Sequence, residues 1–123
     1  MIGTVASCSP KGVSLTSFNL SDLAAIIADR AGSSAEKSYT KSLLDAGTHR
    51  VAKKFGEEAV ELALATVDGD DMALKAEAAD VLYHLLVILQ ARGVSVKDVL
   101  IELESRTKQS GHQEKAARPA SRG

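Results

Sequence analysis

Within residues 53–84, five carboxylates lie in two otherwise mostly apolar segments, on either side of a short acidic turn. They are Glu57, Glu58, Glu61, Glu77 and Asp80. A carboxylate on the apolar side of a helix is costly unless a basic group pairs with it or a cation binds to it. Five such groups in two consecutive helical segments therefore indicate a metal site.

The spacing of these acids suits two antiparallel helices that share one cation. Glu58 and Glu61 are three positions apart, which makes them neighbours on a helix. Glu77 and Asp80 repeat that spacing on the next helix, so a short acidic turn would bring Glu61 opposite Glu77 and Glu58 opposite Asp80. All four ligands are oxygens, with no Cys or His at zinc spacing. They favour Mg²⁺, or Mn²⁺ as a substitute, over Zn²⁺.

Basic residues precede the carboxylates on the first of these helices. Lys54 lies four positions before Glu58, Lys53 is beside it, and Arg50 lies about one turn earlier. Cations at this edge can hold phosphate charge that the metal does not reach. A hard divalent cation neutralises charge on phosphate groups and lowers the pKa of a bound water. Together these residues predict metal-assisted hydrolysis of a phosphoanhydride.

The first cluster also has a purely structural interpretation. Its glutamates could form ordinary ion pairs with the two lysines about one turn earlier, on a solvated helix face. The second pair is harder to explain in this way. Glu77 and Asp80 have few basic neighbours at helical spacing beyond the region of Lys75 and the histidine four positions after Asp80.

Three further residues are candidates for contacts with a substrate. His84 could orient the Asp80 carboxylate, touch the substrate, or be an ordinary hydrogen-bonded histidine of a helical bundle. Tyr39 and Thr40 follow a turn and could contact a nucleotide base or ribose. Tyr83 is interpreted as a packing residue.

Length and composition place the chain among globular helical proteins. Its 123 residues suffice for one domain, 45% of them are hydrophobic and 3% are aromatic. The net charge of −1 gives no indication of nucleic acid or of an anionic membrane as a partner. The single Cys8 cannot form an internal disulfide, which suits a reducing cytoplasm. No apolar run reaches the ~18 residues that a membrane span needs, and the start does not resemble a signal peptide.

Apolar periodicity predicts an all-α fold of four to five helices, without strands. The predicted helices cover Phe18–Ala31, Ser38–Ala46, Thr48 to about Val67, Met72–Arg92, and a last one that is capped at Ser95 and ends near Lys108. Asn19 or Ser21 can cap the first helix and Thr48 the third, while Ser95 and Asp98 have capping-box spacing. The domain thus covers 18–108, between an irregular extension (1–17) and a disordered tail (109–123).

The Met72–Arg92 segment is so apolar that we expect burial on nearly all its sides. Val99, Leu100 and Leu103 are expected to point inward from the last helix. One thin bundle cannot cover that much apolar surface, so the sequence predicts a homodimer that completes a four-helix core.

The motifs resemble those of a known family. The carboxylates stand as EEAVE and, after fifteen residues, EAAD, similar to the EExxE…ExxD signature of the MazG-like, all-α nucleoside triphosphate pyrophosphohydrolases. The segments KSYTKSLLDAG, RVAKKFGEEAVELALA, AEAADVLYHLLVIL and GVSVKDVLIELESR resemble the phosphoribosyl-ATP pyrophosphohydrolase branch, over about residues 18–106.

The resemblance implies Mg²⁺-dependent hydrolysis of phosphoribosyl-ATP to phosphoribosyl-AMP and pyrophosphate in histidine biosynthesis, by a dimeric or larger assembly. It places Glu58, Glu61, Glu77 and Asp80 at metal-ligand positions. Glu57 matches the first motif glutamate, which orients water or a ligand. Lys53, Lys54, Tyr39 and Thr40 match segments near the substrate.

Two alternatives remain at this point. The chain could be a MazG-type house-cleaning pyrophosphatase that acts on a nucleoside triphosphate such as dCTP or dUTP. It could instead be a non-catalytic helical dimerisation module whose glutamates form surface ion pairs.

Overall fold

The structure is a computed structural model that describes residues 17–36 and 38–108. These residues form five α-helices and no strand, which confirms the predicted all-α class. They are α1 (Leu20–Ala31), α2 (Tyr39–Asp45), α3 (Thr48–Asp68), α4 (Asp71–Arg92) and α5 (Val96–Thr107). The expected tail at 109–123 and all of the expected N-terminal extension except Ser17 lie outside the described residues. No helix within the described part combines the length and apolarity that crossing a membrane requires.

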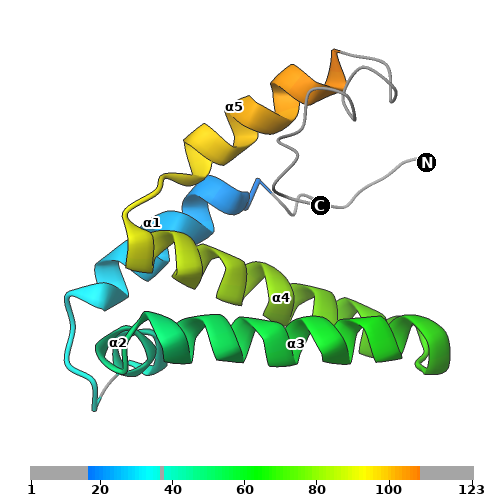
Figure 1. Cartoon of the computed structure of the whole chain (residues 1–123), viewed down its shortest axis with the longest axis horizontal. Helices are drawn as coiled ribbons and strands as arrows, with labels where there is room; N and C mark the ends of the chain where they lie inside the picture. Colours follow the sequence, from blue (N-terminus) through cyan, green and yellow to red (C-terminus); the bar gives the residue numbers. More distant parts are fainter. Residues whose placement is uncertain (1–16, 37, 109–123) are drawn as a thin grey trace.

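The antiparallel pair of α3 and α4 forms the long axis of the molecule (Figure 1). The short α2 lies at the start of α3, and α1 packs on α2, α4 and α5. In Figure 1, α5 diverges from the α3–α4 pair. The five helices thus meet at one end of the hairpin, and the other end consists of two helices alone.

The apolar core lies where the helices meet. It comprises Ile27, Leu43, Val51, Leu86, Val87 and Val96. Val51 stands in the first turn of α3, and Leu86 and Val87 stand in the last third of α4. The carboxylate cluster therefore lies further along the hairpin, between this core and the turn.

Helix ends follow the predicted capping pattern, with two differences. Asn19 caps α1 in a complete capping box with Asp22, so Phe18 lies outside the helix. Ser95 accepts from the Asp98 N–H, as predicted for α5. The prediction of Thr48 as a cap is wrong, because the cap position of α3 is Gly47 with a φ of 99°. That left-handed conformation favours glycine, and Thr48 becomes the first helical residue.

The turn between α3 and α4 is tight and depends on Gly69. A Cβ atom built on Gly69 would lie 2.9 Å from the Ala65 carbonyl oxygen. Asp70 then accepts from the Ala73 N–H and caps α4. This close connection determines which turns of α3 and α4 face each other.

The sequence predicted that α4 is buried on nearly all its sides, but the single chain does not bury it in this way. Its buried residues are His84, Leu86 and Val87, whereas Leu82 is 42% exposed. For α5 the prediction is wrong for Leu100 and Leu103, which are exposed, whereas Val99 is partly buried. The reason is that no further helix covers these faces within the described residues.

Candidate active site

Three carboxylates meet across the α3–α4 hairpin. One oxygen from each of Glu58, Glu77 and Asp80 lies within 4.8 Å of the others. Glu58 projects from α3, and the other two project from successive turns of α4. Oxygen ligands at this mutual distance match the donor set that a hard divalent cation requires. The structure thus brings together three of the four predicted ligands.

Glu77 shows most clearly that a cation would suit this cluster. Its Oε1 is shielded from solvent and has no hydrogen-bond partner among the described residues. Burial raises the pKa of the Glu77 carboxyl, and the charge of Glu61 raises this pKa further, followed by those of Asp80 and Glu58. An unpartnered, shielded oxygen among like charges is unfavourable unless a proton or a metal ion joins it.

The fourth predicted ligand, Glu61, lies at the edge of this cluster. It is exposed and is not one of the three residues whose oxygens lie within 4.8 Å of one another. Its negative charge nevertheless raises the pKa of the Glu77 carboxyl. Glu61 therefore stands beside the three converging carboxylates and faces the same region.

The carboxylates are less buried than the sequence pattern predicted. Only Glu58 is buried, at 7% exposure, and Glu77 is half-buried. Glu57, Glu61 and Asp80 are exposed. They lie on the two-helix part of the hairpin, where the described residues provide no third helix to cover them.

Lys54 forms ion pairs with two glutamates of its own helix, α3. Its Nζ lies 3.2 Å from Oε2 of Glu58 and 3.9 Å from Oε1 of Glu57. The bond to Glu58, followed by the electrostatic effect of the nearby Tyr39 side chain, raises the pKa of the Lys54 ammonium. The ordinary ion-pair interpretation thus holds for Lys54, and no ion pair of Lys53 is present among the described residues.

Lys53 and Arg50 lie on exposed parts of α3. Lys53 lines an open hollow of about 490 Å³ on the outer face of that helix. The other lining residues of this hollow are Gly56, Glu57, Val60 and Glu61. The hollow thus places the Lys53 ammonium group beside Glu57 and Glu61, two of the predicted catalytic residues.

His84 connects the cluster to α2 by two hydrogen bonds. Its Nδ1 lies 2.8 Å from the Asp80 carbonyl oxygen, and its Nε2 lies 3.3 Å from the Tyr39 hydroxyl. A carbonyl only accepts, so Nδ1 donates, and in the tautomer that this bond selects Nε2 is the acceptor for the Tyr39 hydroxyl. The contact with Asp80 is therefore to its main chain and not to the predicted carboxylate. Of the three roles considered for His84, this matches the hydrogen-bonded bundle histidine.

The other α2 candidates differ in their access to solvent. Tyr39 is 53% exposed, and its ring stacks on that of Tyr83 at a centroid distance of 6.3 Å. Thr40 is only 1% exposed and its hydroxyl hydrogen-bonds the Tyr83 hydroxyl. The Thr40 hydroxyl is therefore engaged with Tyr83. It holds Tyr83, which packs against the core as predicted.

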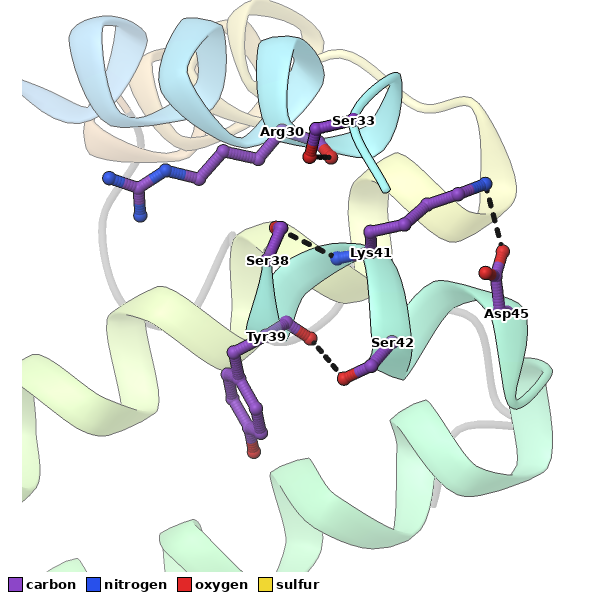
Figure 2. Close-up of polar contacts among 7 residues, drawn as sticks. All are labelled: Arg30, Ser33, Ser38, Tyr39, Lys41, Ser42 and Asp45. Carbon is purple, nitrogen blue, oxygen red and sulfur yellow. Dashed lines mark hydrogen bonds and ion pairs between the residues drawn. The ribbon is translucent and has the colours of Figure 1, made fainter. Parts of the chain in front are cut away.

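Sequence reasoning missed a second group of polar residues, at the junction of α1 and α2. They line a hollow of about 470 Å³, called the Arg30 pocket from here on. Its lining residues are Arg30, Ser33, Ser38, Tyr39, Thr40 and Tyr83. Figure 2 shows the Arg30 side chain extended along the end of α1, with Ser38 and Tyr39 on α2 below it. The sequence contained one indication of this group. Arg30 has no acidic residue three or four positions away, so helix spacing gives it no ion-pair partner.

Comparison with known proteins gives one consistent result. The model of the family described as "Phosphoribosyl-ATP pyrophosphohydrolase" matches residues 20–107. A protein of Methylobacterium radiotolerans named "Phosphoribosyl-ATP pyrophosphatase" is 57% identical over 104 residues, which cover 85% of this chain and 97% of the relative. A protein of the same name from Agrobacterium fabrum is 52% identical over 105 residues, which cover 85% and 98%.

Proposed function

Because the chain belongs to the phosphoribosyl-ATP pyrophosphohydrolase family, we propose that it hydrolyses phosphoribosyl-ATP to phosphoribosyl-AMP and pyrophosphate. Water adds across the anhydride between the first and second phosphates, and that P–O bond breaks. The reaction is the second step of histidine biosynthesis. The observation that carries the proposal is the convergence of Glu58, Glu77 and Asp80 on one point between α3 and α4.

We propose Mg²⁺ as the cofactor, held by Glu58, Glu77 and Asp80, with Glu61 beside them. The shielded, unpartnered oxygen of Glu77 supports this assignment, as does the all-oxygen donor set. When bound, the ion neutralises charge on the substrate's phosphates and makes a water more acidic. Mn²⁺ has the same ligand preference and can substitute.

The remaining residues act on the phosphates and on water. Lys54, Lys53 and Arg50 form the basic side of α3, where they hold phosphate charge. Glu57 and Glu61 line the open hollow on the same helix and orient the attacking water by accepting its hydrogen bonds. Water is thus placed between the anions that orient it and the cations that hold the leaving group.

Tyr39 contributes a different surface. Its ring is exposed, and the bond to His84 together with the stack on Tyr83 holds it at the end of the carboxylate cluster. An aromatic face in this position suits a nucleotide base. His84 and Thr40 act through the tyrosines that they position.

A turnover assay tests this function against the two alternatives. Purified protein is supplied with phosphoribosyl-ATP, dCTP or dUTP, and pyrophosphate release is followed with Mg²⁺ and with a chelator. We expect release from phosphoribosyl-ATP only, and only with metal. Release from dCTP or dUTP alone would identify a MazG-type house-cleaning enzyme. Absence of all turnover, with no thermal stabilisation by Mg²⁺, would favour the dimerisation module.

We also propose that the chain forms a homodimer through the outer faces of the α3–α4 hairpin. Val60, Leu64 and Val67 are exposed on α3 at spacings that align them on one side, and Leu82 is exposed on α4. Light scattering should give twice the chain mass of 12.9 kDa. Leu64→Glu should shift the mass toward that of one chain, whereas an unchanged dimer would show that this stripe is not the interface.

A further inference from the structure

The Arg30 pocket lies beside the carboxylate cluster but shares no residue with it. At about 470 Å³ it is large enough for a substantial part of a small molecule. The end of α1, the start of α2 and one residue of α4 enclose it. It is thus built from the α1–α2 junction and from one residue of α4, which is distant from that junction in the sequence.

The chemistry of the pocket suits an anion. Arg30 is its one charged lining residue and forms no ion pair with any residue in 17–36 or 38–108. Ser38 is buried, and its Oγ accepts from the Lys41 N–H, so its own O–H remains free to donate. A guanidinium and a preset hydroxyl donor, without an acidic neighbour in the lining, match the oxygens of a phosphate group.

Tyr39 connects the pocket to the carboxylate cluster by hydrogen bonds. This residue lines the pocket, and its hydroxyl donates to His84, which in turn donates to the main chain of Asp80. Tyr83 and Asp80 are three positions apart on α4, a rise of about 5 Å along the helix. One extended ligand can therefore reach the metal ligands and the Arg30 pocket together.

Lys41 does not compete for this anion. It pairs with Asp45 at 2.9 Å, and Figure 2 shows that pair on the side of α2 away from Arg30 and Tyr39. The positive charge available to the pocket is thus that of Arg30.

We infer that the Arg30 pocket is a second anion subsite, which binds the phosphate of the substrate's phosphoribosyl group. This inference rests on the proposed function, because phosphoribosyl-ATP carries an anionic group at each end. The triphosphate end lies at the carboxylates and the basic side of α3, and the phosphoribosyl phosphate lies on Arg30 and Ser38. Nucleoside triphosphates such as dCTP lack the phosphoribosyl phosphate, so the pocket determines substrate specificity.

Calorimetric binding of phosphoribosyl-AMP and of AMP tests the subsite, because only the former carries the phosphoribosyl phosphate. The variant is Arg30→Gln. The matched control is Arg92→Gln, since both arginines lie in the last turn of a helix. We expect wild type and control to bind phosphoribosyl-AMP at least about tenfold more tightly than AMP. In Arg30→Gln this preference should vanish while AMP binding stays within about twofold.

Steady-state kinetics give the second measurement. Arg30→Gln should raise KM for phosphoribosyl-ATP at least about tenfold with little change in kcat, because the phosphate contact is the same in ground and transition states. Arg30→Lys keeps the positive charge but not the paired donors of a guanidinium. Its KM for phosphoribosyl-ATP should therefore fall between those of wild type and Arg30→Gln. Should Arg30→Gln fail to fold, Arg30→Lys and Ser38→Ala provide the same comparison.

The possible failures are distinguishable. Wild-type turnover of phosphoribosyl-ATP with an unchanged KM in Arg30→Gln would overturn the subsite and leave the proposed function standing. No wild-type turnover would overturn the proposed function. In that case equal wild-type affinities for phosphoribosyl-AMP and AMP would overturn the subsite as well, and a preference that depends on Arg30 would support it.

Discussion

Nζ of Lys54 lies 3.2 Å from Oε2 of Glu58, the most buried carboxylate of the proposed metal-ligand set. The two groups belong to different parts of the proposed mechanism, since the lysine holds phosphate and the glutamate holds the cation. Without metal they neutralise each other. A divalent cation that takes the Glu58 oxygens weakens this pair and makes the ammonium available to the substrate.

This relationship predicts a metal-dependent effect of Lys54→Met. In metal-free protein the substitution leaves the buried Glu58 carboxylate without its partner, which should lower the free energy of unfolding. With saturating Mg²⁺ the loss should shrink, because the ion replaces the lysine as counter-charge. Urea denaturation with Mg²⁺ and with a chelator measures both values. The control is Lys75→Met, which removes an exposed lysine of α4 that has no ion pair among the described residues. An equal loss in both conditions would contradict the prediction.

Neutral substitutions of the converging carboxylates should separate metal binding from folding. In Glu58→Gln and Asp80→Asn we expect at least a ~100-fold loss in kcat/KM and no rise in Tm with Mg²⁺. Both variants should still fold, because an amide replaces the carboxylate with the same shape. Glu102→Gln is the control, since Glu102 pairs with Arg106 on exposed α5. Retention of the Mg²⁺ shift in either site variant would remove that residue from the ligand set.

Glu77 should make the stability of the metal-free protein depend on pH. Burial and the neighbouring carboxylates raise its pKa in the folded state above the ordinary 4.5, so the folded protein keeps this proton to a higher pH than the unfolded chain. Its contribution to stability is complete below pH 4.5 and decreases as pH rises through the folded pKa. Glu77→Gln should lack this decrease, and the stability difference between variant and wild type should therefore grow with pH.

Urea denaturation of both proteins at several pH values, with a chelator present, measures this difference. Mg²⁺ favours the ionised carboxyl, so it should reverse the trend and make wild type the more stable form at neutral pH. Parallel pH profiles of wild type and variant without metal would refute the assignment of a raised pKa to Glu77.

Two glycines of the hairpin should respond oppositely to alanine. Gly69→Ala places a methyl group 2.9 Å from the Ala65 carbonyl oxygen, so the turn must shift, at about 1–3 kcal/mol. Gly56→Ala meets nothing within 4 Å in the interior of α3 and should stabilise the protein by about 0.5–1 kcal/mol. Thermal unfolding compares the two variants. A neutral Gly69→Ala would show that the turn is not tightly determined.

The helices and the candidate metal ligands were largely readable from the sequence, because both depend on local spacing. Positions three apart on a helix are neighbours whatever surrounds them, so Glu77 and Asp80 had to lie on one side of α4. Polar residues at Asn19 and Ser95 predicted two caps that the structure contains. Thr48 failed as a cap because the left-handed conformation of Gly47 shifts the helix start by one residue.

Burial and long-range contacts were not readable in the same way. An apolar residue on a helix is buried only where another element covers it, and within the described residues neither the hairpin beyond the core nor the outer side of α5 has such cover. Leu82 and Leu103 are consequently exposed despite their apolar surroundings in the sequence. For the same reason Glu57 and Asp80 face solvent, although the pattern placed them on apolar helices.

By itself, the sequence determined the fold class, the family and the set of acids and bases available for chemistry. Those properties follow from residue type and short-range spacing, and both are given directly by the amino-acid sequence. Helix spacing already allowed the pair of Lys54 with Glu58, and the structure contains it. Only the tertiary structure decided that Tyr39 bonds His84 and that Arg30 and Ser38 line one pocket. Both relationships depend on the packing of separate segments around the core, which brings these residues together.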